Sequence, residues 1–144
     1  ALVLSGMLVF SGLGAAFTGR FIGNLPRGIL LAVAGILVLT LLVALGLTPM
    51  LLKLMGLPAG GRAVVSVLAI APVAFFLGMP FPLGMMSLSA RHGDQAAAWG
   101  WGVNGAISVV GVVAAQFLAQ QFSFTLVLLL VVGVYAIAWK VFPK

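Results

Sequence analysis

Residues 28–48 read GILLAVAGILVLTLLVALGLT, a stretch without a single charged residue that is rich in Leu, Val and Ala. A helix that crosses a bilayer needs about 20 mostly apolar residues in succession. The stretch therefore predicts a membrane-spanning helix, and the rest of the chain is organised around it.

Four further stretches have the same apolar character. Together they predict an all-α fold, a polytopic transmembrane helix bundle that occupies residues 1–144 as one domain. Residues 50–62 are too short to span and surround Lys53 with apolar side chains, so we expect a short interfacial segment there. The sequence thus predicts about five spans, at residues 1–19, 28–48, 63–88, 97–120 and 125–139.

Composition excludes a water-soluble globular domain. Hydrophobic residues make up 64% of the chain and charged residues 6%, whereas a soluble domain carries about 25% charged residues. Lipid removes the need for a polar surface, because apolar side chains are free to face outward. The net charge of +6 comes from basic residues scattered singly between apolar runs. A nucleic-acid footprint needs clustered Lys and Arg, so nucleic acid is not an expected partner.

The scattered basic residues also predict an orientation. Connections alternate between the two sides of the membrane, and the side with more Lys and Arg is usually cytoplasmic. Lys53 and Arg62 belong to one side, and the opposite side has more basic residues: Arg20, Arg27, Arg91, Lys140 and Lys144. We expect a multi-pass protein of a bacterial cytoplasmic (inner) membrane, with an external N-terminus and a cytoplasmic C-terminus.

The beginning of the chain predicts a piece of a longer protein. Ala1 lies inside an apolar run, without Met or a basic segment before it, unlike a signal peptide. The chain has no cysteine, which excludes disulfides and thiolate metal sites. No ionisable residue lies well inside a predicted span. A charge at mid-membrane costs at least about 2.5–3.5 kcal/mol and usually marks an ion path. We therefore expect no catalytic, cofactor-binding or metal-ligating residue in these helices, and no self-contained proton-coupled pump.

The most unusual run is GMPFPLG, residues 78–84, with candidate residues Gly78, Pro80, Pro82 and Gly84. Two prolines two positions apart remove backbone donors and interrupt the helical hydrogen-bond ladder. One interpretation is a kink that shapes the bundle. The other is a broken helix that lines a cavity, as in transporters.

A second run, WGWGVNG at residues 99–105, continues as a small and polar stripe. Small residues let helices approach closely, and Asn or Ser side chains can hydrogen-bond across the contact. Helix packing is the favoured interpretation, and a ligand contact at Asn104 is the alternative. The candidate residues are Trp99, Trp101, Asn104, Gly105 and Ser108. The run SGLGA at residues 11–15 is a similar close-packing signal.

Titratable side chains gather in the most polar stretch, residues 89–96, which holds Arg91, His92 and Asp94. A His and an Asp can form an acid/base pair, but this stretch lacks a nucleophile and a second carboxylate. Asp94 is expected to cap the following helix. The favoured interpretation is a solvated capping loop, and the alternative is a loop on which a cytoplasmic domain docks.

Three runs carry a family resemblance: LSGMLVFSGLG at residues 4–14, FLGMPFPLG at residues 76–84 and AWGWGVNGAISVVG at residues 98–111. In this order and spacing they resemble the C-terminal membrane portion of the spermidine synthase-like integral membrane proteins, in which an aminopropyltransferase-like domain is joined to major-facilitator-like helices. The resemblance implies a cytoplasmic domain that binds an S-adenosylmethionine-type nucleotide and a polyamine. None of that domain's functional residues has a match in this chain, so no cofactor is expected here.

A shorter run, GAAFTGRFIGNLPR at residues 14–27, resembles the loop between two helices of major facilitator transporters but lacks that loop's Asp. Three functions follow. The first is a membrane module that anchors or serves the nucleotide-binding domain of a spermidine synthase-like protein. The second is half of a major-facilitator-like small-molecule transporter, and the third is a structural or assembly subunit of a larger membrane complex. The expected partners are the lipid bilayer, the remaining helices and soluble domain of the parent protein, or other membrane subunits.

Overall fold

The computed structural model describes residues 2–54, 56 and 58–142, with residues 47–54 described by their backbone alone. Six α-helices and one 3-10 helix account for nearly all of these residues, and no strand occurs among them. The elements are α1 (Leu2–Phe17), η1 (Thr18–Phe21), α2 (Leu25–Leu54), α3 (Ala59–Leu77), α4 (Pro80–His92), α5 (Asp94–Gln121) and α6 (Phe124–Val141).

The described residues contain five helical segments long and apolar enough to cross a membrane. Two of them combine successive elements, since η1 continues α1, and α3 and α4 form one interrupted segment. The segments are Leu2–Phe21, Leu25–Gly46, Ala59–His92, Asp94–Gln121 and Phe124–Val141. The all-α, polytopic fold class predicted from the sequence is confirmed.

Helix α2 extends beyond the predicted span of residues 28–48 in both directions, and each extension contains a proline. Pro26 lies in the first turn of α2, where its missing N–H would have had no partner. The same helix continues through Pro49 to Leu54, because one proline removes one backbone bond and more often kinks a membrane helix than ends it. The interfacial segment expected at residues 50–62 is therefore divided between the end of α2 and the start of α3. Met55 and Leu57 lie outside the described residues.

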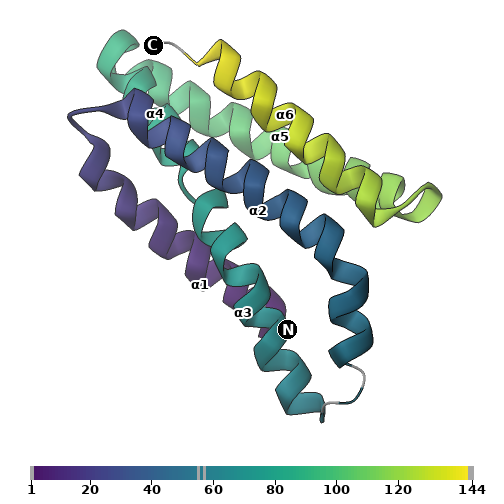
Figure 1. The fold of residues 1–144 in the computed structure, drawn as a ribbon. Coiled ribbons are helices and arrows are strands. Elements are labelled where there is room, and N and C mark those ends of the chain that lie inside the picture. Colours follow the sequence, from purple (N-terminus) through teal and green to yellow (C-terminus); the bar gives the residue numbers. More distant parts are fainter. Residues whose placement is uncertain (1, 55, 57, 143–144) are drawn as a thin grey trace.

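Helix α2 is the central element of the bundle. It packs against α3, α4 and α6, whereas α1 packs mainly on α3, and α5 packs on α4 and α6. Figure 1 shows α2 running between the α1–α3 pair and the α5–α6 pair. The bundle thus consists of two helical pairs joined by one helix and by the α3–α4 segment.

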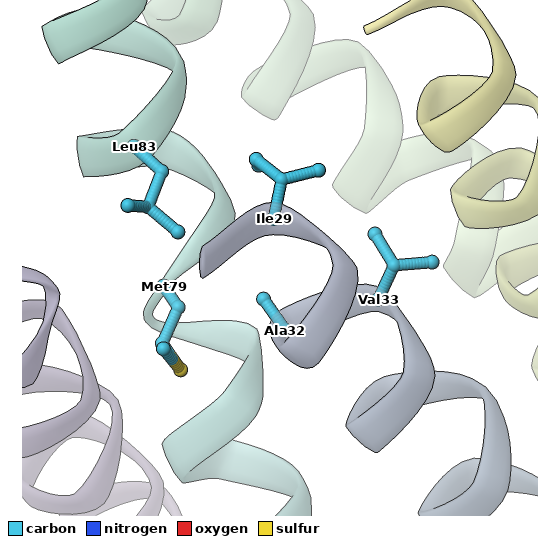
Figure 2. Close-up of a cluster of buried hydrophobic side chains, with 5 residues drawn as sticks. All are labelled: Ile29, Ala32, Val33, Met79 and Leu83. Atoms are coloured by element: carbon cyan, nitrogen blue, oxygen red, sulfur yellow. The ribbon is translucent and has the colours of Figure 1, made fainter. Parts of the chain in front are cut away.

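The core lies where α2 meets the interruption between α3 and α4. Ile29, Ala32 and Val33 recur on α2 at the i, i+3, i+4 spacing of one helix face, and all three are buried. Met79 and Leu83 are fully buried against them. Figure 2 shows these side chains gathered around the interruption, with Met79 in the connection itself. Burial of apolar side chains of the α3–α4 segment against α2 fixes α3 and α4 relative to α2.

The bundle is open. A compact monomer of 14.8 kDa is expected to expose about 7,000 Å², and this chain exposes 9371 Å². Helix α5 contributes no buried residue, and its large apolar side chains such as Val110 and Phe117 are exposed. Soluble monomers rarely expose apolar patches of more than a few hundred Å². The outward apolar surface is what a membrane helix requires.

Candidate functional site

The interruption between α3 and α4 is a break in the helical hydrogen-bond ladder, although Gly78 and Met79 keep helical backbone torsions. Helix α3 ends at Leu77, and α4 begins at Pro80. Gly78 and Met79 remain connected to α3 by backbone bonds to carbonyls of residues 74–76, at 3.1 to 3.3 Å. Leu83 is the first residue of α4 whose N–H donates to a preceding carbonyl, that of Met79 at 3.2 Å. The break therefore spans about one helical turn.

The break leaves an excess of backbone acceptors. In the described part of the chain, the carbonyls of Leu77 and Gly78 accept no backbone hydrogen bond. Pro82 is four residues after Gly78 and has no N–H to donate to it, which is why that carbonyl has no helical partner. Unpaired carbonyls in hydrocarbon cost several kcal/mol each unless another group satisfies them.

Helix α1 lies unusually close to the break. A Cβ atom on Gly78 would overlap the carbonyl oxygen of Ser11, and a Cβ atom on Gly14 would overlap that of Phe75. Because each overlap is with backbone, only glycine fits at either position. The small residues of the run at 11–15 thus pack against α3, as expected for a close helix contact.

A groove runs along this break, and we name it the break groove. Its volume is about 650 Å³. Its walls come from α1, from the α3–α4 break and from α5. The lining residues are Leu8, Ser11, Gly12, Ala15, Leu77, Gly78, Phe81, Pro82, Met85, Trp101 and Asn104. The structure therefore brings the three sequence runs at residues 11–15, 78–84 and 99–105 together at one site.

Helix α5 contributes an aromatic and an amide to the groove. The Trp101 ring meets the Phe81 ring edge to face, with centroids 4.7 Å apart. One turn later, Asn104 faces the groove, and no hydrogen bond joins its side-chain amide to another described residue. Its backbone carbonyl accepts from the Ser108 hydroxyl at 2.6 Å. The groove thus offers a free amide beside the acceptor-rich break.

The other predicted residues lie outside the groove lining. Pro80 starts α4, whereas Gly84 and Gly105 have open space where a Cβ would be, so neither supports a close helix contact within this chain. Trp99 is 73% exposed. Ser108 belongs to the same helix as Asn104, and its hydroxyl donates to the Asn104 backbone carbonyl.

Sequence reasoning missed several lining residues because their side chains are ordinary membrane apolar groups. Leu8, Leu77 and Met85 carry no pattern that separates them from neighbouring lipid-facing residues. Phe81 had a detectable signal, since it lies between two prolines and its ring is therefore placed beside a backbone break.

A second depression lies at one end of the bundle, and we name it the end basin. Its volume is about 430 Å³. It is formed by the α1–α2 connection, the last turn of α4 and the residue after α6. Its lining residues are Ile22, Gly23, Asn24, Leu25, Pro26, Ser87, Ala90, Arg91 and Phe142. Three connections distant in sequence therefore meet at this end.

The predicted docking loop is a tight turn beside the end basin. Arg91 and His92 belong to the last turn of α4, and Asp94 to the first turn of α5. Gly93 joins the helices with φ of 80°, a conformation that favours glycine. The cap expected from Asp94 is not formed: Gly93 is the N-cap residue, and the Asp94 carboxylate accepts from the Ser89 hydroxyl at 2.7 Å.

Each charge in this turn has the sign that its helix end favours, with basic side chains at the C-terminus of α4 and the carboxylate at the N-terminus of α5. His92 and Asp94 are exposed. The turn therefore presents charged side chains at the end of the bundle.

Comparisons with protein-family models, with curated proteins and with solved structures found no match to this chain.

Proposed function

We propose that this chain is the membrane module of a spermidine synthase-like integral membrane protein, and that its basic end carries a cytoplasmic nucleotide-binding domain. The observation that supports this is that four basic residues belong to elements that end toward one end of the bundle, where Arg91 lines the end basin. Arg20, Arg27, Arg91 and Lys140 lie in η1, the start of α2, the end of α4 and the end of α6. In Figure 1, the α1–α2 connection, the α4–α5 turn and the C-terminal end of α6 lie toward one end of the bundle.

Charge complementarity favours a protein partner with an acidic face at this end. The chain has seven basic residues and a single acidic one, so its own side chains leave most of the basic groups without a carboxylate. Arg20 lies over the Phe17 ring, 4.5 Å from the centroid, which holds its guanidinium at the bundle surface. Exposed His92 offers a nearby contact point.

Photocrosslinking in the complete protein tests this role. A benzophenone amino acid at position 92 is expected to crosslink to the nucleotide-binding domain. The same group at position 60, at the start of α3 and remote from the end basin, is the matched control and is expected not to. A complete reading frame without a nucleotide-binding segment, or equal crosslinking from both positions, would contradict the proposal.

The break groove favours a second function, that of a transporter-like module that binds a small molecule within the membrane. Interrupted helices in transporters place unpaired backbone groups beside the substrate or ion. Here the interruption, a free amide and two aromatic rings line one groove. The test is whether proteoliposomes that contain the protein take up a small molecule that binds in the break groove.

A further inference from the structure

We infer that the break groove is a binding site for a primary ammonium group, which would donate its N–H groups to the unpaired acceptors at the α3–α4 break. This inference deepens the second proposed function, since it names the class of molecule that the groove would take. It rests on the chemistry of the groove walls and is independent of the end basin.

The first argument is the balance of donors and acceptors. The carbonyls of Leu77 and Gly78 have no backbone donor in the described part of the chain, and both residues line the groove. A primary ammonium carries three N–H donors and no acceptor. Hydrogen bonds from a charged donor are about twice as strong as neutral ones. An ammonium group therefore matches what the break lacks.

The second argument is electrostatic. The C-terminal end of a helix carries a partial negative charge, and α3 ends at the groove. The opposing N-terminus of α4 would attract anions through its first N–H groups. However, Pro80 and Pro82 have none to offer, and Leu83 already donates to Met79. The α4 end is thus left with the Phe81 N–H, so carbonyl acceptors outnumber N–H donors at the break.

The third argument concerns the side chains of the groove. Among the described residues its lining contains no carboxylate, so it is unlike the oxygen cages that hold divalent metal ions. The described lining contains no Lys or Arg either, so those side chains would not repel a cation. The Asn104 amide supplies a further oxygen acceptor. Phe81 and Trp101 also line the groove, and an aromatic ring attracts a cation placed over its face.

Equilibrium binding in lipid nanodiscs tests the inference. In a variant with Trp99→Phe and Trp139→Phe, Trp101 is the single tryptophan and lies in the groove. Titration with propylammonium chloride is expected to change its fluorescence saturably. Tetramethylammonium chloride has the same charge but no N–H, and is expected to bind at least about tenfold more weakly. Equal binding of the two cations, or no saturable response, would overturn the inference.

Two pairs of variants locate the site. Asn104→Leu is expected to weaken propylammonium binding at least about tenfold. Asn104→Gln is expected to retain binding. Gln116→Leu, on the same helix but outside the groove lining, is the control. Gly12→Phe is expected to abolish binding, because a side chain at this open position on the groove wall would fill the groove. Gly133→Phe, also open but on α6, is the matched control.

The second pair keeps the test decisive if Asn104→Leu does not fold, since Gly12 and Gly133 both have free space around the added side chain. Unchanged binding in Gly12→Phe would overturn the site. Saturable binding in nanodiscs without propylammonium uptake into proteoliposomes would uphold the site and contradict the transport function.

Discussion

At the scale of single residues, the structure separates glycines that look alike in the sequence. Gly78 and Gly105 each belong to a Gly-containing run that the sequence singles out, at residues 78–84 and 99–105. At Gly78 an added Cβ would overlap the backbone carbonyl of Ser11, whereas at Gly105 it would meet nothing within 4 Å. Only the first glycine therefore holds two helices of this chain together.

Gly78→Ala is accordingly expected to destabilise the bundle by about 1–3 kcal/mol, the usual effect of overpacking a tight contact. The overlapping atom is backbone, so relief requires α1 and α3 to move apart. Detergent-induced unfolding in mixed micelles measures the change, with Gly105→Ala as the matched control. A Gly78→Ala protein as stable as the control would show that α1 and α3 are not in close backbone contact.

At the scale of elements, the α3–α4 break decides the form of the molecule. Pro80 and Pro82 withhold the N–H groups that would reach the carbonyls of Phe76 and Gly78 in a continuous helix. Met79, in the break, is completely buried against α2. Packing against α2 thus supports the segment at the point where its hydrogen-bond ladder is incomplete.

Replacing both prolines, Pro80→Ala with Pro82→Ala, is expected to restore those hydrogen bonds and join α3 to α4. Hydrogen–deuterium exchange of the amides around residues 77–84 should then slow about tenfold, which corresponds to about 1.4 kcal/mol. Pro72→Ala, within α3, removes a proline away from the break and should leave exchange there unchanged. Fast exchange in the double variant would mean that packing against α2, and not the prolines, interrupts the helix.

At the scale of the whole molecule, the distribution of charge gives the bundle two unlike ends. Arg91 lines the end basin, and Arg20, Arg27 and Lys140 belong to elements that end toward the same end of the bundle. Arg62 belongs to the start of α3 at the other end. Lys144, expected at the basic end, lies outside the described residues. By the positive-inside rule, we expect the basic end to face the cytoplasm.

Cysteine accessibility tests this orientation against a clean background, because the chain has no cysteine of its own. Gly23→Cys and Gly60→Cys both place the new side chain in exposed positions with free space. In intact cells, a membrane-impermeant maleimide is expected to label position 60 and to leave position 23 unlabelled until the membrane is opened. The reverse pattern would invert the topology.

The sequence predicts its helices well because membrane insertion depends on local chain properties. An apolar stretch such as residues 28–48 must satisfy its own amides in hydrocarbon, so length and composition alone predict its structure. Boundaries at Pro26 and Pro49 were less predictable, since a proline's effect depends on whether its missing N–H would have had a partner.

The sequence by itself determined the five apolar helical segments, the interruption at Pro80 and Pro82, and the scarcity of charge within the helices. Only the tertiary structure decided that Ser11, Gly78 and Asn104 line one groove, and that none of the residues of α5 is buried. The physical reason is the distance along the chain over which each kind of interaction acts. Hydrogen bonding and hydropathy act within a helix, whereas the choice of neighbours depends on backbone approach and side-chain volume between residues far apart in the chain.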